Sequence, residues 1–167
     1  MQKKIPGRML LKVVGIILII LGVMGVLSAV STIMMAGSIS SGQMAQEMLD
    51  ILEQTAGPLG VDPGYLMSAG IISAVNSAVY MILGIFGILY SKRPDKGKRS
   101  FIFGIVLIVL ALAVQAHNAV YGVMTVMNLI IALVFPLLYT WGGYRNMQAY
   151  EGTKTETDSG QDTRMEK

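Results

Sequence analysis

The sequence has 167 residues, of which 53% are hydrophobic and 14% are charged, with a net charge of +3, an isoelectric point of about 9.2 and a mean hydropathy of +0.61. This composition leaves too little polar surface to cover a water-soluble domain, so a membrane protein is expected. The basic residues lie in three clusters, 3–12, 92–99 and 145–167, which membrane topology explains without a nucleic-acid partner.

Four apolar segments are long enough to cross a hydrocarbon layer, which is about 30 Å thick and needs roughly 20 residues at a helical rise of about 1.5 Å. They span residues of about 11–36, 66–90, 101–117 and 122–144. Each is expected to be a helix, because an open strand would leave backbone amides unpaired in lipid. The predicted fold class is all-α, an integral membrane four-helix bundle.

The first segment follows several basic residues, as the apolar core of a secretory signal does. A signal core has about 7 to 15 residues, whereas this run is longer than about 20 and no clear A-x-A cleavage site follows it. The sequence therefore predicts an uncleaved first span.

The loop between the first two spans, residues 37–65, contains four acids and no base. Its segment 43–55 places apolar residues on one side of a helical wheel and polar ones on the other, which predicts an amphipathic helix. Ser40 and Gln43 can form a capping box at its start. The apolar side can cover the end of the bundle or serve as a docking face for a partner, with Met67 as a further flexible side chain. The candidate docking residues are Met44, Met48, Ile51 and Leu52.

The second span carries a stripe of small and polar side chains at helical steps of three and four. The stripe consists of Ala69, Ser73, Asn76, Tyr80, Gly84 and Gly87. Such a stripe favours close packing against another helix, and Gly25 and Ala29 of the first span offer a partner surface. The alternative is a polar pocket or pore lined by Ser73, Asn76, Ser77 and Tyr80.

The fourth span contains Asn128, which depth along the span predicts to be buried, and Pro136, which predicts a local kink. Aromatic residues are expected to form belts at the two membrane surfaces. Tyr90, Tyr139, Trp141 and Tyr144 would mark the inner surface, and Tyr65 and Tyr121 the outer one.

Residues 15–21 (GIILIIL) and 104–110 (GIVLIVL) match closely, each a few residues after a basic side chain. The match suggests two helical hairpins related by duplication, in parallel orientation, although both segments use the same small set of apolar residues.

The last residues are rich in Thr, Glu, Asp, Ser, Gly, Gln and Lys and cannot bury enough apolar surface to fold alone. The sequence therefore predicts a four-span transmembrane domain over residues 1–148 and a disordered cytoplasmic tail over residues 149–167.

The charge distribution predicts the topology. Basic residues near the ends of membrane helices are retained on the cytoplasmic side, so both termini and the loop 91–100 are expected inside. The acidic loop 37–65 and its helix are then extracytoplasmic. A multi-pass protein of the cytoplasmic membrane is expected.

Two segments carry a family resemblance: residues 12–18 (KVVGIIL) and 136–146 (PLLYTWGGYRN). They resemble the first and last spans of small uncharacterised four-span membrane proteins of Gram-positive bacteria. The resemblance covers about a fifth of the chain and implies a bacterial membrane protein. It implies no site residues, because those families have no established activity.

No enzyme is expected, since the chain has no Cys, a single His and no acid at membrane depth to activate a nucleophile. The same inventory predicts no catalytic residue, no metal site and no cofactor. Claudins and tetraspanins are also disfavoured, because their outer loops depend on cysteines. The predicted partners are the bilayer and a second copy or another membrane protein. The function predicted is a non-catalytic accessory, scaffold or sensor subunit. The alternative is a small channel or transporter component with a polar intramembrane path lined by Ser73, Asn76, Tyr80 and Asn128.

Overall fold

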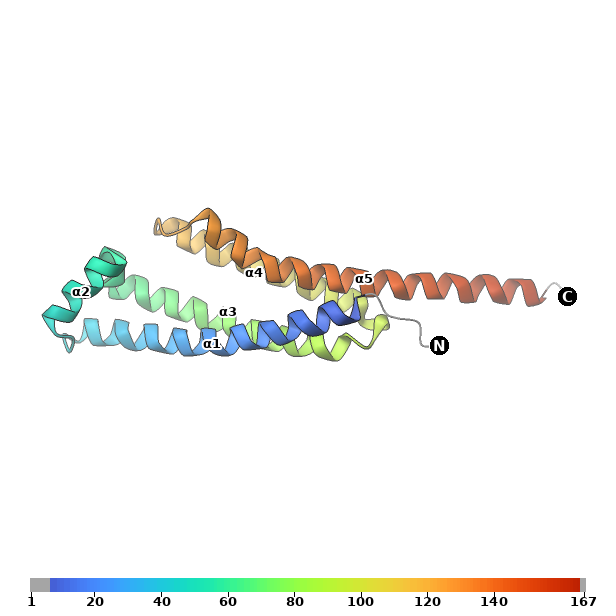
Figure 1. Ribbon diagram of the computed structural model, residues 1–167, viewed down its shortest axis with the longest axis horizontal. Helices are drawn as coiled ribbons and strands as arrows, with labels where there is room; N and C mark the ends of the chain where they lie inside the picture. Colours follow the sequence, from blue (N-terminus) through green and yellow to red (C-terminus); the bar gives the residue numbers. More distant parts are fainter. Residues whose placement is uncertain (1–6, 166–167) are drawn as a thin grey trace. The chain divides into compact units, whose positions relative to one another are not determined.

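The structure is a computed structural model that describes the backbone of residues 7–165 and the side chains of residues 7–93 and 95–152. Every regular element in residues 7–165 is helical, and no strand occurs there (Figure 1). The α-helices are α1 (Arg8–Ser40), α2 (Gln46–Ala56), α3 (Pro63–Tyr90), α4 (Gly97–Val120) and α5 (Val126–Met165). Two short 3-10 helices, η1 (Pro58–Gly60) and η2 (Pro94–Lys96), lie in the connections before α3 and α4.

Four helices are long and apolar enough to cross a membrane: Arg8–Ser40, Pro63–Tyr90, Gly97–Val120 and Val126–Gly152. The predicted all-α class with four membrane-spanning helices is confirmed. Helices α1, α3 and α4 begin three or four residues before the predicted apolar segments, whereas α5 begins four residues later. The helices begin before the apolar segments because the backbone must stay hydrogen-bonded until it reaches water. At the starts of α1 and α4, the long basic side chains of Arg8, Lys98 and Arg99 can extend to water from this position.

The chain forms two compact units, of which unit 1 holds Met1–Ile19 and Ile82–Lys167 and unit 2 holds Ile20–Met81. Within the described residues, unit 1 contains the start of α1, the end of α3 and all of α4 and α5. Unit 2 contains the rest of α1, α2, η1 and the first part of α3. Helices α1 and α3 each belong to both units.

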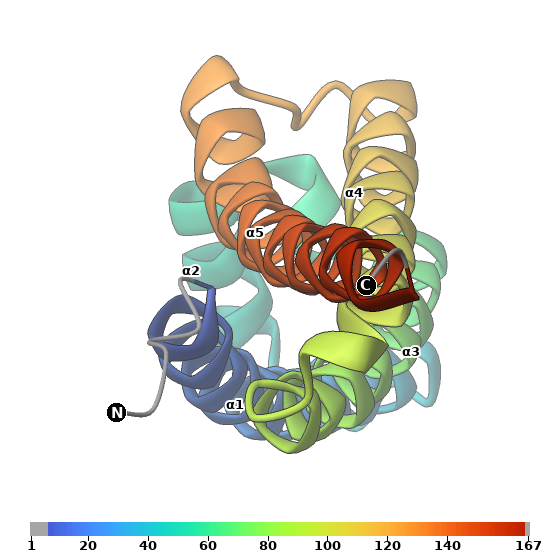
Figure 2. The same ribbon diagram turned by 90° about the vertical axis from the view of Figure 1, so that its right-hand side faces the viewer.

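In unit 1, the antiparallel helices α4 and α5 approach closely at three glycines (Figure 2). A methyl group added at Gly97 would lie 2.5 Å from the Met147 backbone nitrogen, and one at Gly143 would lie 2.5 Å from the Phe101 nitrogen. At Gly104 it would lie 2.6 Å from Thr140 Cα. These contacts involve backbone atoms, so the two helices can pack at this distance only with glycine. The apolar interior of unit 1 is built from Leu11, Val14, Leu18, Leu83, Leu107, Ala111 and Tyr139.

The two matching segments of α1 and α4 bury the same positions. Gly15 and Gly104, which start them, are both buried and both lie against the next long helix. Leu18 and Leu107, three residues later, are both fully buried. Aligning the two segments in sequence therefore also aligns their buried positions, as parallel duplicated hairpins require.

Helices α1 and α4 end in the same way, each one residue before a Ser-Gly or Tyr-Gly pair. Gly42 and Gly122 have φ values of 67° and 71°. Around Gly42, its own N–H donates to the Ile39 carbonyl and the Gln43 N–H donates to that of Ser38. Gly122 and Val123 make the equivalent bonds to Ala119 and Asn118. These are Schellman motifs, in which glycine supplies the left-handed conformation.

The predicted capping box of the amphipathic helix is wrong. Ser40 is the last residue of α1, and α2 starts at Gln46 after Ala45, with no side chain capping its first turn. The reason is that the Schellman motif at Gly42 uses residues 38–43 to end α1, so the next helix has to start later.

Helix α5 continues through Met165, and residues 166–167 lie outside the described part. The disordered cytoplasmic tail expected over residues 149–167 stays a prediction. Extending an existing helix adds one hydrogen bond per residue without a new nucleus, so a sequence too polar to fold alone can still continue one. Gln148 supports the extension, because its Nε2 donates to the Tyr144 hydroxyl one turn earlier at 2.8 Å.

Candidate functional site

The main feature of the pairing between α1 and α3 is a seam of small residues repeated every seven positions. Gly15 faces Gly84 in unit 1, whereas Gly22 faces Ser77 and Ala29 faces Gly70 in unit 2. A methyl group on Gly15 or on Gly84 would lie 2.7 Å from the carbonyl oxygen of the other residue, and one on Gly22 would lie 2.8 Å from that of Ser77. Antiparallel helices with a seven-residue repeat keep their facing residues aligned, so the small side chains allow close contact between the two helices within each unit.

Gly25 extends this seam in unit 2, because a methyl group there would collide with the Ser77 side chain. Ser77 is buried, and Ala29 is only 1% exposed. The two residues of α1 proposed from the sequence, Gly25 and Ala29, thus lie against α3. The alternative polar pocket includes Ser77, but the side chain of this residue packs against α1.

The residues of the predicted stripe on α3 lie in three different environments. Gly84 belongs to the seam with α1, whereas Gly87 accommodates the Tyr139 ring of α5 in unit 1. Ala69, Ser73, Asn76 and Tyr80 are half-buried. The residues that complete the seam are Gly70 and Ser77, each one position after a member of the predicted stripe. The seven-residue spacing of Gly70, Ser77 and Gly84 is the sequence signal that identifies them.

Asn76 and Tyr80 form a side-chain hydrogen bond one turn apart on α3. The Asn76 Oδ1 atom is buried and has no hydrogen-bond partner among the described residues. A buried amide oxygen without a partner costs free energy, so it attracts a water molecule or another donor. Asn128, the other amide proposed for a polar path, is exposed in the first turn of α5, where its N–H donates to Thr125 Oγ1 at 3.2 Å. Its predicted burial is wrong, because α5 starts only two residues earlier.

Tyr139 is a core residue that the sequence placed in an interfacial belt. Its side chain is 0% exposed, and its hydroxyl donates to the Leu83 carbonyl of α3 at 2.9 Å. Gly87 makes the space for the ring, since a methyl group there would lie 2.6 Å from Tyr139 Cε2. Tyr139 therefore joins α5 to α3 inside unit 1. Gly87 lies one turn after Leu83, but the sequence does not indicate that Tyr139 occupies the space at this glycine.

Two further polar side chains are buried near the basic residues of unit 1. Asn146 of α5 and Ser100 of α4 are both 0% exposed, and neither side chain has a hydrogen-bond partner among the described residues. The Asn146 side chain lies beside Gly7, because a methyl group on Gly7 would approach Asn146 Oδ1 to 2.5 Å. The Asn146 and Ser100 side chains are both fully buried, so they contribute to packing and add polar atoms to the interior near the basic residues of unit 1.

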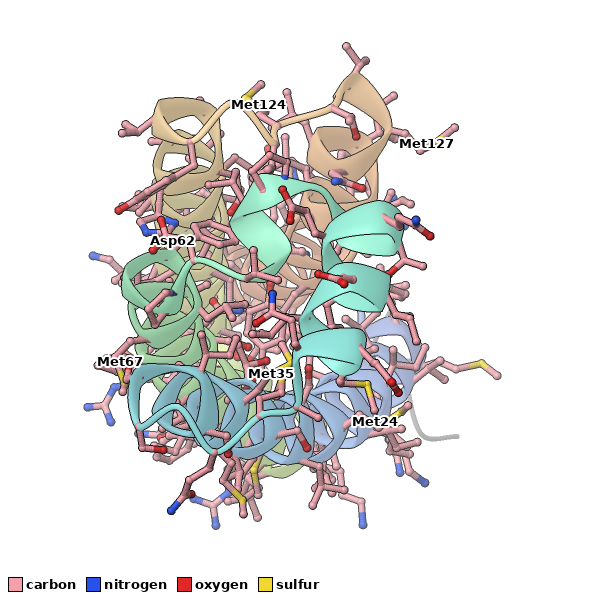
Figure 3. All side chains as sticks on the ribbon, turned by 90° about the vertical axis from the view of Figure 1, so that its left-hand side faces the viewer. Met24, Met35, Asp62, Met67, Met124 and Met127 are labelled. Atoms are coloured by element: carbon pink, nitrogen blue, oxygen red, sulfur yellow. The ribbon has the colours of Figure 1, made fainter. Side chains whose placement is uncertain are left out.

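Helix α2 in unit 2 has no buried residue. Its predicted docking residues differ in exposure: Met48 is 51% exposed and Ile51 is 55% exposed, whereas Met44 and Leu52 are half-buried. The Leu52 backbone lies near η1, since a methyl group on Gly60 would lie 3.4 Å from the Leu52 carbonyl oxygen. Met67 points outward from α3 on the side away from α2 (Figure 3), so it does not extend the α2 surface. The free apolar surface of α2 is thus centred on Met48 and Ile51.

Among the described side chains, no group of three or more His, Asp or Glu residues is close enough to hold a metal ion. The polar atoms in the helical interior are amides and hydroxyls, which bind and pack but do not act as strong acids or bases near neutral pH. Comparisons with protein-family models, curated protein sequences and solved structures found no match.

Proposed function

We propose that this multi-pass membrane protein is a non-catalytic accessory, scaffold or sensor subunit that works through helix–helix contacts. The observation that carries the proposal is the seam between α1 and α3, in which Gly15, Gly22, Gly25 and Ala29 pack against Gly70, Ser77 and Gly84. The seam holds α1 against α3 within each unit. The exposed pair Met48 and Ile51 on α2 remains available to a membrane-protein partner.

A partner that accepts α2 would present an apolar groove for Met48 and Ile51, bordered by basic groups. Glu47, Asp50 and Glu53 are exposed on the same helix and supply the complementary charge. Helix-in-groove binding uses side chains at steps of three and four, which is the spacing of this pair. Flexible methionine adapts to the shape of such a groove.

Replacing Met48 and Ile51 together by serine is expected to remove a stoichiometric membrane partner that copurifies with the wild-type protein. The loss follows because two central apolar contacts of an interface are deleted, and such contacts carry most of the binding energy. Affinity purification in mild detergent, with quantification of the bound partner, measures the effect. The matched control is Gln46→Ser with Gln54→Ser, which alters two exposed polar residues of the same helix and should retain the partner.

The second candidate function is a small channel or transporter component with a polar path beside Asn76 and Tyr80. The unpaired Asn76 Oδ1 favours it, because such an atom can bind a passing water or ion. Selective flux through vesicles containing only this protein, lost in Ser73→Ala with Asn76→Ala while the protein stays folded, would contradict the accessory function and support this one. Unchanged flux in that variant agrees with packing.

We also propose that the termini and the α3–α4 connection face the cytoplasm of a bacterial cell, with α2 outside. The exposed basic residues Arg8, Lys12, Lys92 and Arg145 support this orientation by the positive-inside rule. An epitope inserted after Gly42 is expected to be accessible to antibody on intact cells, and one at Lys167 only after permeabilisation. The opposite labelling pattern would invert the topology.

A further inference from the structure

The basic residues of unit 1 gather where α1, α4 and the middle of α5 meet the α3–α4 connection. Those with described side chains are Arg8, Lys12, Lys92, Arg93, Lys96, Lys98, Arg99 and Arg145, and all but the half-buried Lys96 are exposed. Asp95 pairs with Lys96 at 3.7 Å, which leaves the other bases of this group in large excess over acids. A surface of this charge attracts anions.

Beside these charges, aromatic rings from α4 and α5 form a surface cluster. The Tyr144 ring lies 6.1 Å from Phe101 of α4 and 6.3 Å from Trp141, between ring centroids. Trp141 is 56% exposed, and the Tyr144 hydroxyl is held by Gln148 at 2.8 Å. Rings with an apolar body and a polar edge prefer the level of lipid headgroups, so this cluster marks the membrane surface.

Two basic side chains border the aromatic cluster. Lys98 lies one helical turn before Phe101 on α4, and Arg145 directly follows Tyr144 on α5. The contacts of Gly97 with Met147 and of Gly143 with Phe101 fix this part of α4 against α5, so both basic residues are held near the rings. We call Lys98, Phe101, Trp141, Tyr144 and Arg145 the aromatic–basic patch.

Apolar side chains continue from the patch along the same two helices. Ile102 and Ile105 of α4 and Leu137 and Leu138 of α5 are all exposed. In a membrane these side chains face acyl chains. The patch therefore offers a phospholipid cationic groups at headgroup level and apolar side chains below it.

We propose that the aromatic–basic patch is a binding site for an anionic phospholipid, with Lys98 and Arg145 holding the phosphate-bearing headgroup. Arg145 suits this role because a guanidinium donates two parallel hydrogen bonds to a phosphate. Trp141 lies beside the glycerol region, and the exposed isoleucine and leucine side chains contact the acyl chains. The site differs from the α2 surface in position and in ligand.

Trp141 provides the measurement, because it is the only tryptophan in the sequence. The full-length protein is reconstituted in vesicles of phosphatidylcholine that contain an increasing fraction of brominated phosphatidylglycerol or, separately, brominated phosphatidylcholine. Bromine quenches tryptophan fluorescence at contact, so the two curves give the relative affinity of the site for the anionic lipid. Each basic residue near an anionic surface contributes about fivefold in affinity, so we expect a preference of about fivefold or more.

The Lys98→Gln, Arg145→Gln double variant is expected to lower this preference to near one. The matched control Lys92→Gln, Arg93→Gln removes two positive charges outside the patch and should keep most of the preference for the anionic lipid. Lys98→Arg with Arg145→Lys, which preserves both charges, should also keep it and shows that the site tolerates substitution. Circular dichroism confirms the helical fold of each variant.

Three results would overturn the proposal. One is equal quenching of the wild-type protein by the two brominated lipids at low salt. Another is an equal loss of preference in the two glutamine variants, which would mean diffuse surface charge without a site. The third is displacement of the lipid by inorganic phosphate at an ionic strength where chloride has no effect, which would make a soluble phosphate compound the ligand.

Discussion

Replacing Gly84 by leucine is expected to lower the free energy of unfolding by about 3 kcal/mol, because the added side chain has no space in the seam. Even a methyl group at this position would lie 2.7 Å from the Gly15 carbonyl oxygen and 3.1 Å from the Ile19 nitrogen. Backbone atoms of a helix cannot rotate away as a side chain can, so the two helices would have to separate. Denaturation by sodium dodecyl sulfate in mixed micelles, followed by Trp141 fluorescence and circular dichroism, measures the change.

Gly37→Leu is the matched control, since it makes the same substitution in α1 at a glycine with no neighbouring atom within 4 Å. It should not destabilise the protein and is expected to stabilise it slightly, by up to about 1 kcal/mol, because leucine favours helix more than glycine does. If both variants unfold at the same detergent fraction, the close packing of the seam is refuted.

Much of the fold follows from the solvent, because a membrane accepts only helices or closed barrels and sets their length. The apolar runs therefore predict four spanning helices before any packing is known. Side-chain contacts are harder to predict from the sequence. Gly25 and Ala29 were recognised as a packing surface, but on α3 the choice between Asn76 and Ser77 depends on a rotation of one residue, about 100° around the helix axis.

The features that sequence did not predict depend on contacts between segments far apart in the chain. Tyr139 has the composition of a belt residue, and its burial depends on the space above Gly87, 52 positions earlier. The start of α2 depends on how α1 ends, through the hydrogen bonds around Gly42. Local sequence preferences are compatible with either position of Tyr139 and with either start of α2. Packing decides the first and backbone hydrogen bonding decides the second.

Helix packing in lipid connects the seam to the proposed function. Helices in lipid gain little from the hydrophobic effect when they associate, so contact area and small residues determine which surfaces pair. The small residues of the seam are used within the chain, whereas the α2 surface and the aromatic–basic patch are exposed surfaces of distinct chemistry. One is apolar and acidic and suits a protein, and the other is aromatic and basic and suits a lipid.

Replacing Tyr139 by alanine is expected to lower the free energy of unfolding by about 3 kcal/mol, because the fully buried ring leaves a cavity against Gly87. Tyr139→Phe keeps the ring and loses only the hydrogen bond to Leu83, so its cost should be about 0.6 kcal/mol, the average for such bonds in membrane helices. The Leu83 carbonyl keeps its ordinary helical hydrogen bond in this variant, so no acceptor is left unpaired. The mixed-micelle denaturation used for Gly84→Leu measures both variants.

Tyr150→Ala serves as the control for Tyr139→Ala, because Tyr150 lies on the same helix but is 44% exposed. This control substitution should change the free energy of unfolding by no more than about 0.5 kcal/mol, as for most surface substitutions. The expected order of destabilisation is Tyr139→Ala first, Tyr139→Phe second and Tyr150→Ala last. A loss in Tyr139→Phe as large as in Tyr139→Ala would show that the hydroxyl, and not the ring against Gly87, holds α5 to α3.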